Sequence, residues 1–330
     1  MLILGRDDIL KVFSIRDAIE ADKKAFMLHT KGKTKMPLRI NIDNDKRDGQ
    51  LMFMPAYVGG ELNMGGVKIV SCFTGNAQKG LPVIPATMAV VDGDTGVVSA
   101  IIDGTTLTQL RTAAISGAAA ELLSNPDSSV GALFGTGGQA PSQLEALMTV
   151  RELKELRVYD ALEGRAAAFA EKYQPLADRF GTRLKAAATP KEAVSGADLI
   201  TTVTTSRKAV FDAEDIKAGC HVTGVGSYTP EMCEIPEGLL ARAARIFVDN
   251  REAVLAEAGD FIMPMKRGLF SPDRIDGELG ELLLGEAAGR ASRDDITVMK
   301  TVGFAALDVV AAAELVKRAK EAGAGTEINL

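Results

Sequence analysis

Hydrophobic residues in the first part of the chain follow a helical spacing. Between residues 7 and 32, apolar side chains recur with a helical period, at Ile19, Ala25, Phe26 and Leu28. The string Ser14-Ile15-Arg16-Asp17 resembles a capping box, and Gly32 can end a helix because glycine readily adopts left-handed backbone angles. We therefore predict a helix over residues 7–32.

Between Pro37 and Ile102 the pattern changes to short apolar runs. Runs of this kind, separated by turn sequences such as Asp92-Gly93-Asp94-Thr95-Gly96, are typical of β-strands. We predict strands at Leu38–Ile42, Gln50–Pro55, Gly66–Phe73, Thr87–Asp92 and Val97–Ile102. Because no helix is expected between them, they should form an antiparallel or mixed sheet. An alanine-rich helix should follow, ending near Leu123.

After residue 124, strand-like and helix-like segments alternate. Strands are predicted at Val130–Phe134, Arg157–Asp160, Arg183–Ala187, Leu199–Val203, His221–Val225 and Arg245–Val248, with helices at 140–153, 163–173 and 190–196. This alternation is typical of a doubly wound α/β fold with a parallel sheet. It ends near Ile296–Met299, and a long helix from Phe304 to about Ala322 is expected to return to the first region.

A glycine-rich turn joins the predicted strand Val130–Phe134 to the next helix, with the sequence Gly135-Thr136-Gly137-Gly138-Gln139-Ala140. In a dinucleotide-binding turn one glycine permits the tight bend and the next lets the backbone approach the pyrophosphate. The small third residue lets the helix pack on the strand, and the helix N-terminus supplies N–H donors. The motif and its setting predict a Rossmann domain.

The ends of other predicted strands should face the same ligand, because ligands of such sheets bind beyond the carboxyl ends. These positions are Asp160, then Thr204, Thr205 and Ser206, and then Val225, Gly226 and Ser227. An acid at Asp160 would bind the adenosine ribose hydroxyls and repel a 2′-phosphate, which favours NAD. Arg165 lies close enough in sequence to leave NADP open.

Composition narrows the range of functions. A length of 330 residues favours two domains, and a net charge of -6 argues against binding to nucleic acid or an anionic membrane. No uncharged apolar run approaches the length of a transmembrane helix, and the acidic N-terminus is unlike a signal peptide. Cys72, Cys220 and Cys233 lack metal-type spacing and suit a reducing compartment. We expect a cytoplasmic protein without a bound metal.

Three basic residues have apolar or small neighbours. Arg39 lies between Leu38 and Ile40, Lys68 lies within an apolar strand, and Arg111 lies on the alanine-rich helix. A cation in such a position either reaches solvent or pairs with an anion in a cleft. The pattern alone favours solvent for all three.

Seven strings together resemble the ornithine cyclodeaminase/mu-crystallin family over essentially the whole chain. They are Pro37-Leu38-Arg39, Phe53-Met54-Pro55-Ala56, Gly66-Val67-Lys68-Ile69-Val70, Leu107-Thr108-Gln109-Leu110-Arg111-Thr112-Ala113-Ala114, Gly135-Thr136-Gly137-Gly138-Gln139-Ala140, Gly224-Val225-Gly226-Ser227 and Lys300-Thr301-Val302-Gly303-Phe304-Ala305. The combination of three basic residues with the glycine turn is specific to that family.

The resemblance implies a homodimer with a discontinuous first domain. Residues 1–123, completed by 304–330, would bind substrate and form the dimer, and residues 124–303 would form the NAD-binding Rossmann domain. It further implies that the positions of Arg39, Lys68 and Arg111 face the nicotinamide and hold a substrate carboxylate. Guanidinium groups suit that role, because their paired donors match a carboxylate. The cofactor set implied by the resemblance also includes Thr112, Lys300, Val302 and Gly303.

The family contains several chemistries that pass through an α-imino acid and exchange a hydride with the nicotinamide. Its cyclodeaminases carry an aspartate after the segment that matches Gly226-Ser227, whereas this chain has Tyr228, with Glu231 three residues further on. Because an unperturbed tyrosine is a poor base near neutral pH, the residue at this position argues against cyclodeamination.

The expected activity is NAD(P)H-dependent reduction of a 2-imino acid to an L-amino acid, or the reverse dehydrogenation. Candidate substrates are iminosuccinate, iminopyruvate and a cyclic ketimine. An ornithine cyclodeaminase-type lyase and a non-enzymic mu-crystallin-like binding protein are the alternatives.

Overall fold

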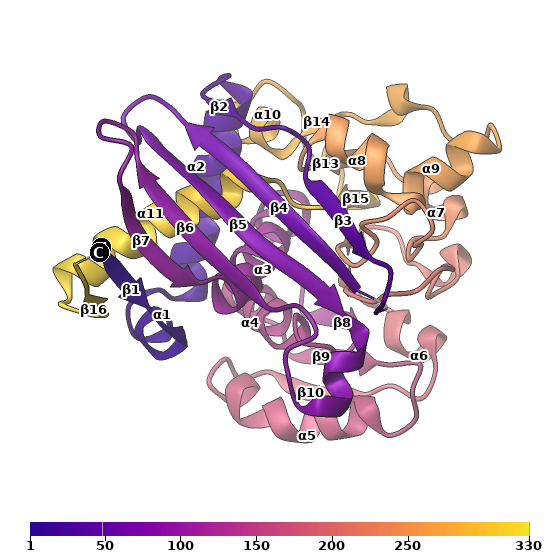
Figure 1. Ribbon diagram of the computed structural model, residues 1–330. Helices are drawn as coiled ribbons and strands as arrows, with labels where there is room; N and C mark the ends of the chain where they lie inside the picture. Colours follow the sequence, from indigo (N-terminus) through magenta and orange to yellow (C-terminus); the bar gives the residue numbers. More distant parts are fainter. Residues whose placement is uncertain (48, 330) are drawn as a thin grey trace. The chain divides into compact units, whose positions relative to one another are not determined.

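The computed structural model describes residues 1–47 and 49–329, and the chain forms two compact units (Figure 1). Unit 1 comprises Met1–Arg111 and Phe304–Leu330, and unit 2 comprises Thr112–Gly303. The first boundary lies within helix α3 (Gly104–Leu123), whereas the sequence placed it after residue 123.

Within the described residues, unit 1 contains a mixed sheet of eight strands. Their order is β16-β1-β7-β6-β5-β4-β2, with β3 also paired to β4. The strands are β1 (Leu2–Leu4), β2 (Thr34–Lys35), β3 (Ile40–Asn44), β4 (Gly49–Val58), β5 (Met64–Phe73), β6 (Ala86–Asp92), β7 (Val98–Asp103) and β16 (Thr326–Glu327). The pair β1–β7 is parallel and the other pairs are antiparallel, which fits the expected antiparallel or mixed sheet.

Helices α2 (Ile15–Thr30) and α11 (Ala305–Glu321) pack against each other, and α11 lies on β4, β5 and β6 (Figure 1). The prediction of one helix over residues 7–32 is wrong, because α1 (Arg6–Val12) ends before α2 begins. Ser14 separates them: its hydroxyl accepts from the Asp17 backbone N–H at 3.2 Å, and Asp17 accepts from the Ser14 N–H at 2.9 Å. This reciprocal cap begins a new helix. A short 3₁₀ turn, η1 (Thr74–Lys79), follows β5.

Unit 2 contains, among its described residues, a parallel sheet with the order β10-β9-β8-β11-β12-β15-β13-β14. Its strands are β8 (Val130–Phe134), β9 (Glu155–Tyr159), β10 (Arg183–Ala186), β11 (Leu199–Thr202), β12 (His221–Gly224), β13 (Arg245–Val248), β14 (Gly277–Glu278) and β15 (Thr297–Lys300). The segment near Ile296–Met299, where the sequence indicated an end to the alternation, instead inserts β15 between β12 and β13.

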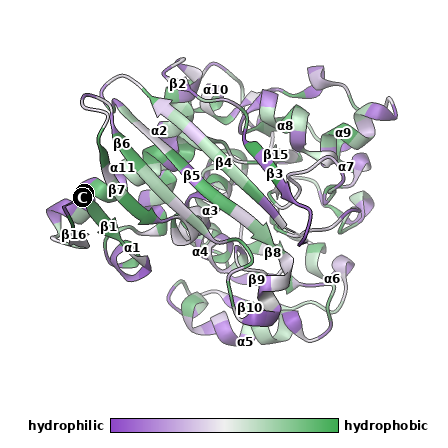
Figure 2. Cartoon of the chain, viewed as in Figure 1, coloured by the Kyte–Doolittle hydropathy of each residue, from purple (hydrophilic) through white to green (hydrophobic). Residues whose placement is uncertain are grey.

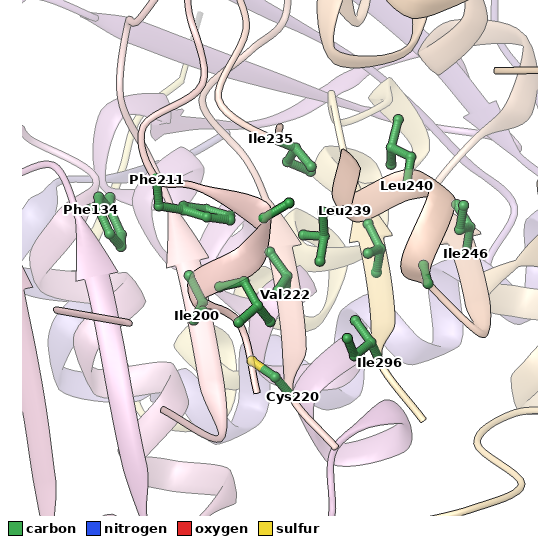
Figure 3. Packing of buried hydrophobic residues seen from close by; sticks show 14 of the residues in the cluster. Phe134, Ile200, Phe211, Cys220, Val222, Ile235, Leu239, Leu240, Ile246 and Ile296 are labelled. Carbon is green, nitrogen blue, oxygen red and sulfur yellow. The ribbon is translucent and has the colours of Figure 1, made fainter. Parts of the chain in front are cut away.

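Helices separate the strands of unit 2, and two hydrophobic clusters lie on its sheet. Its helical segments are the later part of α3, α4 (Ala140–Val150), α5 (Arg165–Asp178), α6 (Pro190–Val194), η2 (Ala213–Asp215), α7 (Glu237–Arg242), α8 (Arg251–Glu257), α9 (Gly259–Lys266), η3 (Pro272–Arg274) and α10 (Leu279–Leu284). Adjacent residues of β8 belong to different clusters: Phe134 lies in one and Leu133 lies in the other. Figure 3 shows the first, in which Phe134 and Phe211 pack beside Ile200 and Val222.

Hydrophobic residues concentrate in the strands and in α11 (Figure 2). Among the described residues, no helix is both long and apolar enough to span a membrane.

Candidate functional site

The glycine turn of unit 2 begins directly after β8, and its first residue, Gly135, has left-handed backbone angles. Gly135 has a φ of 97°, and a Cβ built there would lie 2.8 Å from the Val203 carbonyl oxygen. Both facts require glycine. A Cβ on Gly137 would meet nothing within 4 Å, so its backbone borders open space. Ala140 is buried at the start of α4. The turn therefore has the shape expected of a phosphate-binding loop.

Asp160 follows β9 and is bonded to this turn. Its Oδ2 accepts from the Thr136 backbone N–H at 3.1 Å and from the Thr136 hydroxyl at 2.6 Å, while its Oδ1 accepts from the Leu162 N–H at 2.9 Å. A cavity of about 350 Å³ lies beside the carboxylate. It is lined by Phe134, Gly135, Thr136, Gly137, Tyr159, Asp160, Ala161, Leu162, Arg165, Val203, Thr204, Thr205, Ser206 and Val210. The turn, the acid and the end of β11 thus surround one space.

The Glu234 side chain accepts hydrogen bonds from the loops that follow β11 and β12. The carboxylate is fully buried; Oε1 accepts from the Thr204 N–H at 2.6 Å, and Oε2 accepts from the N–H groups of Gly226 and Ser227 at 2.6 and 3.0 Å. A Cβ on Gly226 would lie 2.0 Å from the Thr204 carbonyl oxygen, so only glycine permits this approach. Burial raises the pKa of Glu234, and the nearby Lys300 charge opposes that rise.

Asp249, which follows β13, accepts hydrogen bonds from the segment that follows β15. The buried carboxylate accepts from the Thr301 hydroxyl at 2.5 Å, the Val302 N–H at 3.0 Å and the Gly303 N–H at 2.6 Å. Burial raises the pKa of Asp249, although these hydrogen bonds act in the opposite direction. Lys300 is also fully buried, with its Nζ 3.0 Å from Asp260 Oδ2. The cation therefore lies inside unit 2, paired to an acid.

The remaining members of the predicted cofactor set occupy varied positions in unit 2. Val225 is buried after β12, and Gly138 is exposed at the rim of the glycine turn. The carbonyl of Thr112 accepts from Gln143 Nε2 at 3.3 Å. Gln139 is half-buried before α4. These residues do not line the cavity beside Asp160.

Unit 1 holds a second cluster, built on Asp308 of α11. Lys68 of β5 donates to both Asp308 carboxylate oxygens at 2.8 Å, and Arg111 Nε donates to Oδ1 at 2.9 Å. Lys68 and Arg111 are 1% and 5% exposed, so the solvent position that the pattern alone favours is wrong for both. Arg39 is half-buried just before β3. Its charge also acts on Lys68.

These contacts alter the ionisation of the cluster. Burial, with repulsion from the Arg111 charge, lowers the pKa of Lys68 to about 7, although Asp308 opposes the change. For Asp308, burial alone would raise the pKa, but the charges of Arg111 and Lys68 bring it below its ordinary value. Asp22 of α2 is fully buried beside these charges, and neither of its carboxylate oxygens has a hydrogen-bond partner among the described residues. Burial raises the pKa of Asp22 well above its ordinary value.

Sequence reasoning identified the three cations but none of the buried acids beside them or beside the loops of unit 2. It omitted Asp22, Asp308, Glu234, Asp249 and Asp260. The available signal was a lone acidic residue in an apolar run, as in Phe247-Val248-Asp249. Such a residue can equally follow a strand without a special role, so the pattern alone does not select it.

The parallel sheet, the glycine turn and Asp160 define unit 2 as a Rossmann-type dinucleotide-binding domain. Residues 2–323 match the sequence profile of the ornithine cyclodeaminase/mu-crystallin family. This chain belongs to that family.

Relatives of known activity match over their full length. The chain is 34% identical to the Δ1-pyrroline-2-carboxylate reductase of Bacillus cereus, covering 100% of both chains. The Thermococcus litoralis Δ1-pyrroline-2-carboxylate reductase, solved with NADH and L-proline, superposes with a TM-score of 0.94 at 34% identity, covering 99% of this chain and 100% of that one. An archaeal alanine dehydrogenase dimer with bound NAD gives 0.91 at 32% identity, covering 100% and 99%. These relatives are oxidoreductases of imino or amino acids.

Proposed function

We propose that this protein is an NAD-dependent reductase that converts a 2-imino acid to the L-amino acid and also catalyses the reverse dehydrogenation. The observation that carries the proposal is the buried Lys68–Asp308–Arg111 cluster, in which the pKa of Lys68 is about 7. A buried ammonium that titrates near neutral pH is suited to exchange a proton with an imine nitrogen.

The described residues of unit 2 fit the cofactor. The open backbone at Gly137 and the start of α4 would bind the pyrophosphate, and Asp160 would bind the adenosine ribose. Thr204–Ser206 line the cavity beside Asp160 and would contact the adenosine side of the cofactor. The segments Val225–Ser227 and Lys300–Gly303, together with Thr112, would hold the nicotinamide portion. A carboxylate at Asp160 disfavours a 2′-phosphate, so NAD is the proposed cofactor, while Arg165 beside the cavity leaves NADP to be tested. When bound, the reduced cofactor supplies the hydride.

Residues of unit 1 would bind the substrate. Arg39 and Arg111 would bind the imino acid through its carboxylate, and Asp308 would hold the Arg111 side chain in place through their ion pair. Lys68 would donate a proton to the imine nitrogen while the imine carbon receives the hydride, which yields the amine. Asp308 orients Lys68 through two hydrogen bonds, so the proton donor is fixed before substrate binds.

The deciding experiment measures oxidation of NADH and of NADPH with Δ1-pyrroline-2-carboxylate, and with pyruvate or oxaloacetate in the presence of high ammonium. The cyclic ketimine is the first choice, because the reductases of B. cereus and T. litoralis are named for it. Rapid oxidation with any of the three supports imine reduction and identifies the substrate class. If all three fail and ornithine releases ammonia without net NADH formation, the protein is a lyase; nucleotide binding without turnover of any substrate would indicate a binding protein.

We also propose that the protein is a homodimer. The uncovered face of the unit 1 sheet carries large apolar side chains: Ile40, Ile42, Leu51, Tyr57 and Ile69 are each exposed by about a third to a half. They lie on the three adjacent strands β3, β4 and β5, with Ile42 directly opposite Leu51. A contiguous apolar patch of this kind usually marks a protein interface. The alanine dehydrogenase relative, which is described as a dimer, supports this proposal.

A further inference from the structure

The carboxyl ends of β11, β12 and β15 are neighbours in the unit 2 sheet, and one buried network joins them. Lys300, the last residue of β15, contacts Asp260 Oδ2 at 3.0 Å. Asp260 Oδ1 accepts from the backbone N–H groups of Glu234 and Ile235 at 2.6 and 2.9 Å. Glu234 then accepts from the loops after β11 and β12 through Thr204, Gly226 and Ser227.

Glu234 is the acceptor that these two loops share. Its two oxygens receive three backbone N–H groups, two of them at 2.6 Å. Without the carboxylate, these N–H donors would face one another with no acceptor between them, and an unpaired buried donor is costly. The two loops also approach too closely for any side chain at Gly226. The geometry therefore depends on a single acceptor of the right length and charge.

Asp260 and Lys300 hold that acceptor in position. Glu234, Asp260 and Lys300 are all within 1% of complete burial, so water does not compete for their contacts. Lys300 offsets part of the negative charge of the two acids, and Asp260 fixes the backbone of residues 234 and 235. Because all three side chains are buried, they lie behind the loop backbone and not on the exposed surface.

We propose that Glu234 is a positioning residue for the cofactor: it sets the separation of the loops after β11 and β12, and the Asp260–Lys300 pair holds it in place. This inference rests on the proposed cofactor contacts of Thr204, Gly226 and Ser227. Lys300 thereby acts through Asp260, and contact between its Nζ and the nucleotide is not required.

The test compares NADH binding by the full-length wild type with that of Glu234→Gln, measured by fluorescence titration without substrate. Glutamine keeps the shape but places an N–H₂ group against backbone donors, so we expect the Kd to rise at least tenfold. Glu234→Asp keeps the charge but is one methylene too short to bond to both loops, and it should raise the Kd at least threefold. Because Glu234→Asp retains the charge, it tests the positioning role of Glu234 even if Glu234→Gln does not fold.

Asp198→Asn is the matched control. Asp198 likewise accepts from two backbone N–H groups, those of Ser129 and Val130 at 2.8 and 2.9 Å, but at the amino end of β8. We expect its thermal midpoint to fall while the NADH Kd stays within twofold of wild type. A Kd within twofold in both Glu234 variants, or an equal rise in Asp198→Asn, would overturn the proposal.

The binding readout separates this inference from the proposed reaction. If wild type binds NADH and reduces no imine, the proposed reaction fails while the Glu234 variants still decide the positioning role. If imine reduction is observed, Glu234→Gln should raise the KM for NADH more than the KM for the imino acid, because the network lies with the nucleotide loops. An equal rise in both values, with an unchanged Kd, would count against the positioning role.

Discussion

At the scale of single residues, Lys68 carries the clearest consequence for activity. Its pKa of about 7 makes the protonated form abundant only below neutral pH. In the proposed reaction, imine reduction uses that proton, so kcat/KM for reduction should fall as the pH rises through about 7, whereas kcat/KM for the reverse dehydrogenation should rise. Measuring kcat/KM in both directions between about pH 5.5 and 9 tests the direction of each change. The NADH Kd, measured without substrate over the same range, shows whether cofactor binding itself depends on pH.

Replacing Lys68 with methionine removes the proposed proton donor but keeps an unbranched side chain. We expect kcat to fall by about 100-fold or more, the usual size of a general-acid contribution, with the NADH Kd within about twofold of wild type. Lys24→Met is the control, since Lys24 is a half-buried lysine outside the Asp308 cluster whose partner, Glu314, also lies on α11. Turnover that survives in Lys68→Met would show that the proton comes from elsewhere.

Asp22 is expected to affect the stability of the fold and its dependence on pH. The folded carboxyl holds its proton to higher pH than the unfolded one, so this residue makes folding less favourable as pH rises above about 4. Asp22→Leu removes both the buried unpaired oxygens and this dependence. We expect the free energy of unfolding at pH 7 to rise by ~1–3 kcal/mol, with a smaller gain at pH 5. Urea titrations at the two pH values measure this, and a gain that grows on acidification would contradict the argument.

At the scale of elements, the glycine turn offers two contrasting substitutions. Gly135→Ala forces a side chain into left-handed angles and against the Val203 carbonyl, so it should destabilise the fold by about 1–3 kcal/mol. Gly137→Ala meets no protein atom within 4 Å, so stability should stay within about 0.5 kcal/mol of wild type. Its methyl group would occupy the space of the pyrophosphate, and NADH affinity should fall. Thermal unfolding and NADH titration of both variants separate the two effects.

The contrast between predicted and observed elements has physical causes. Strands β8 and β13 have the predicted bounds because apolar runs between turn residues define them. Strands β1, β2, β14 and β16 are two or three residues long, too short to show any periodicity. The predicted 7–32 helix was too long because the reciprocal cap at Ser14 begins a new helix at that point. Glu234 was missed because its partners Thr204 and Asp260 lie 30 and 26 residues away in sequence.

At the scale of the whole molecule, the two units have different electrostatic designs. In unit 1, two buried basic side chains share one ionised acid, Asp308, so the cluster carries net positive charge while Lys68 is protonated. In unit 2, buried acids accept backbone N–H groups and shape the loops. In the proposed function, binding of the imino acid therefore depends on charge, whereas binding of the nucleotide depends on backbone geometry.

The apolar patch on the unit 1 sheet makes the proposed dimer testable. On the uncovered sheet face, Ile42 is 49% exposed and lies directly opposite Leu51 of β4. Ile42→Glu places a charge in this apolar patch, and burying it in an interface would be unfavourable. We expect light scattering with size exclusion to show about 70 kDa for wild type, twice the 34.8 kDa chain, and a shift of the variant toward monomer. Leu10→Glu, at a 49% exposed position on α1 and away from the patch, is the control. A monomeric wild type would refute the proposal, and a dimer that persists in Ile42→Glu would place the interface on another surface.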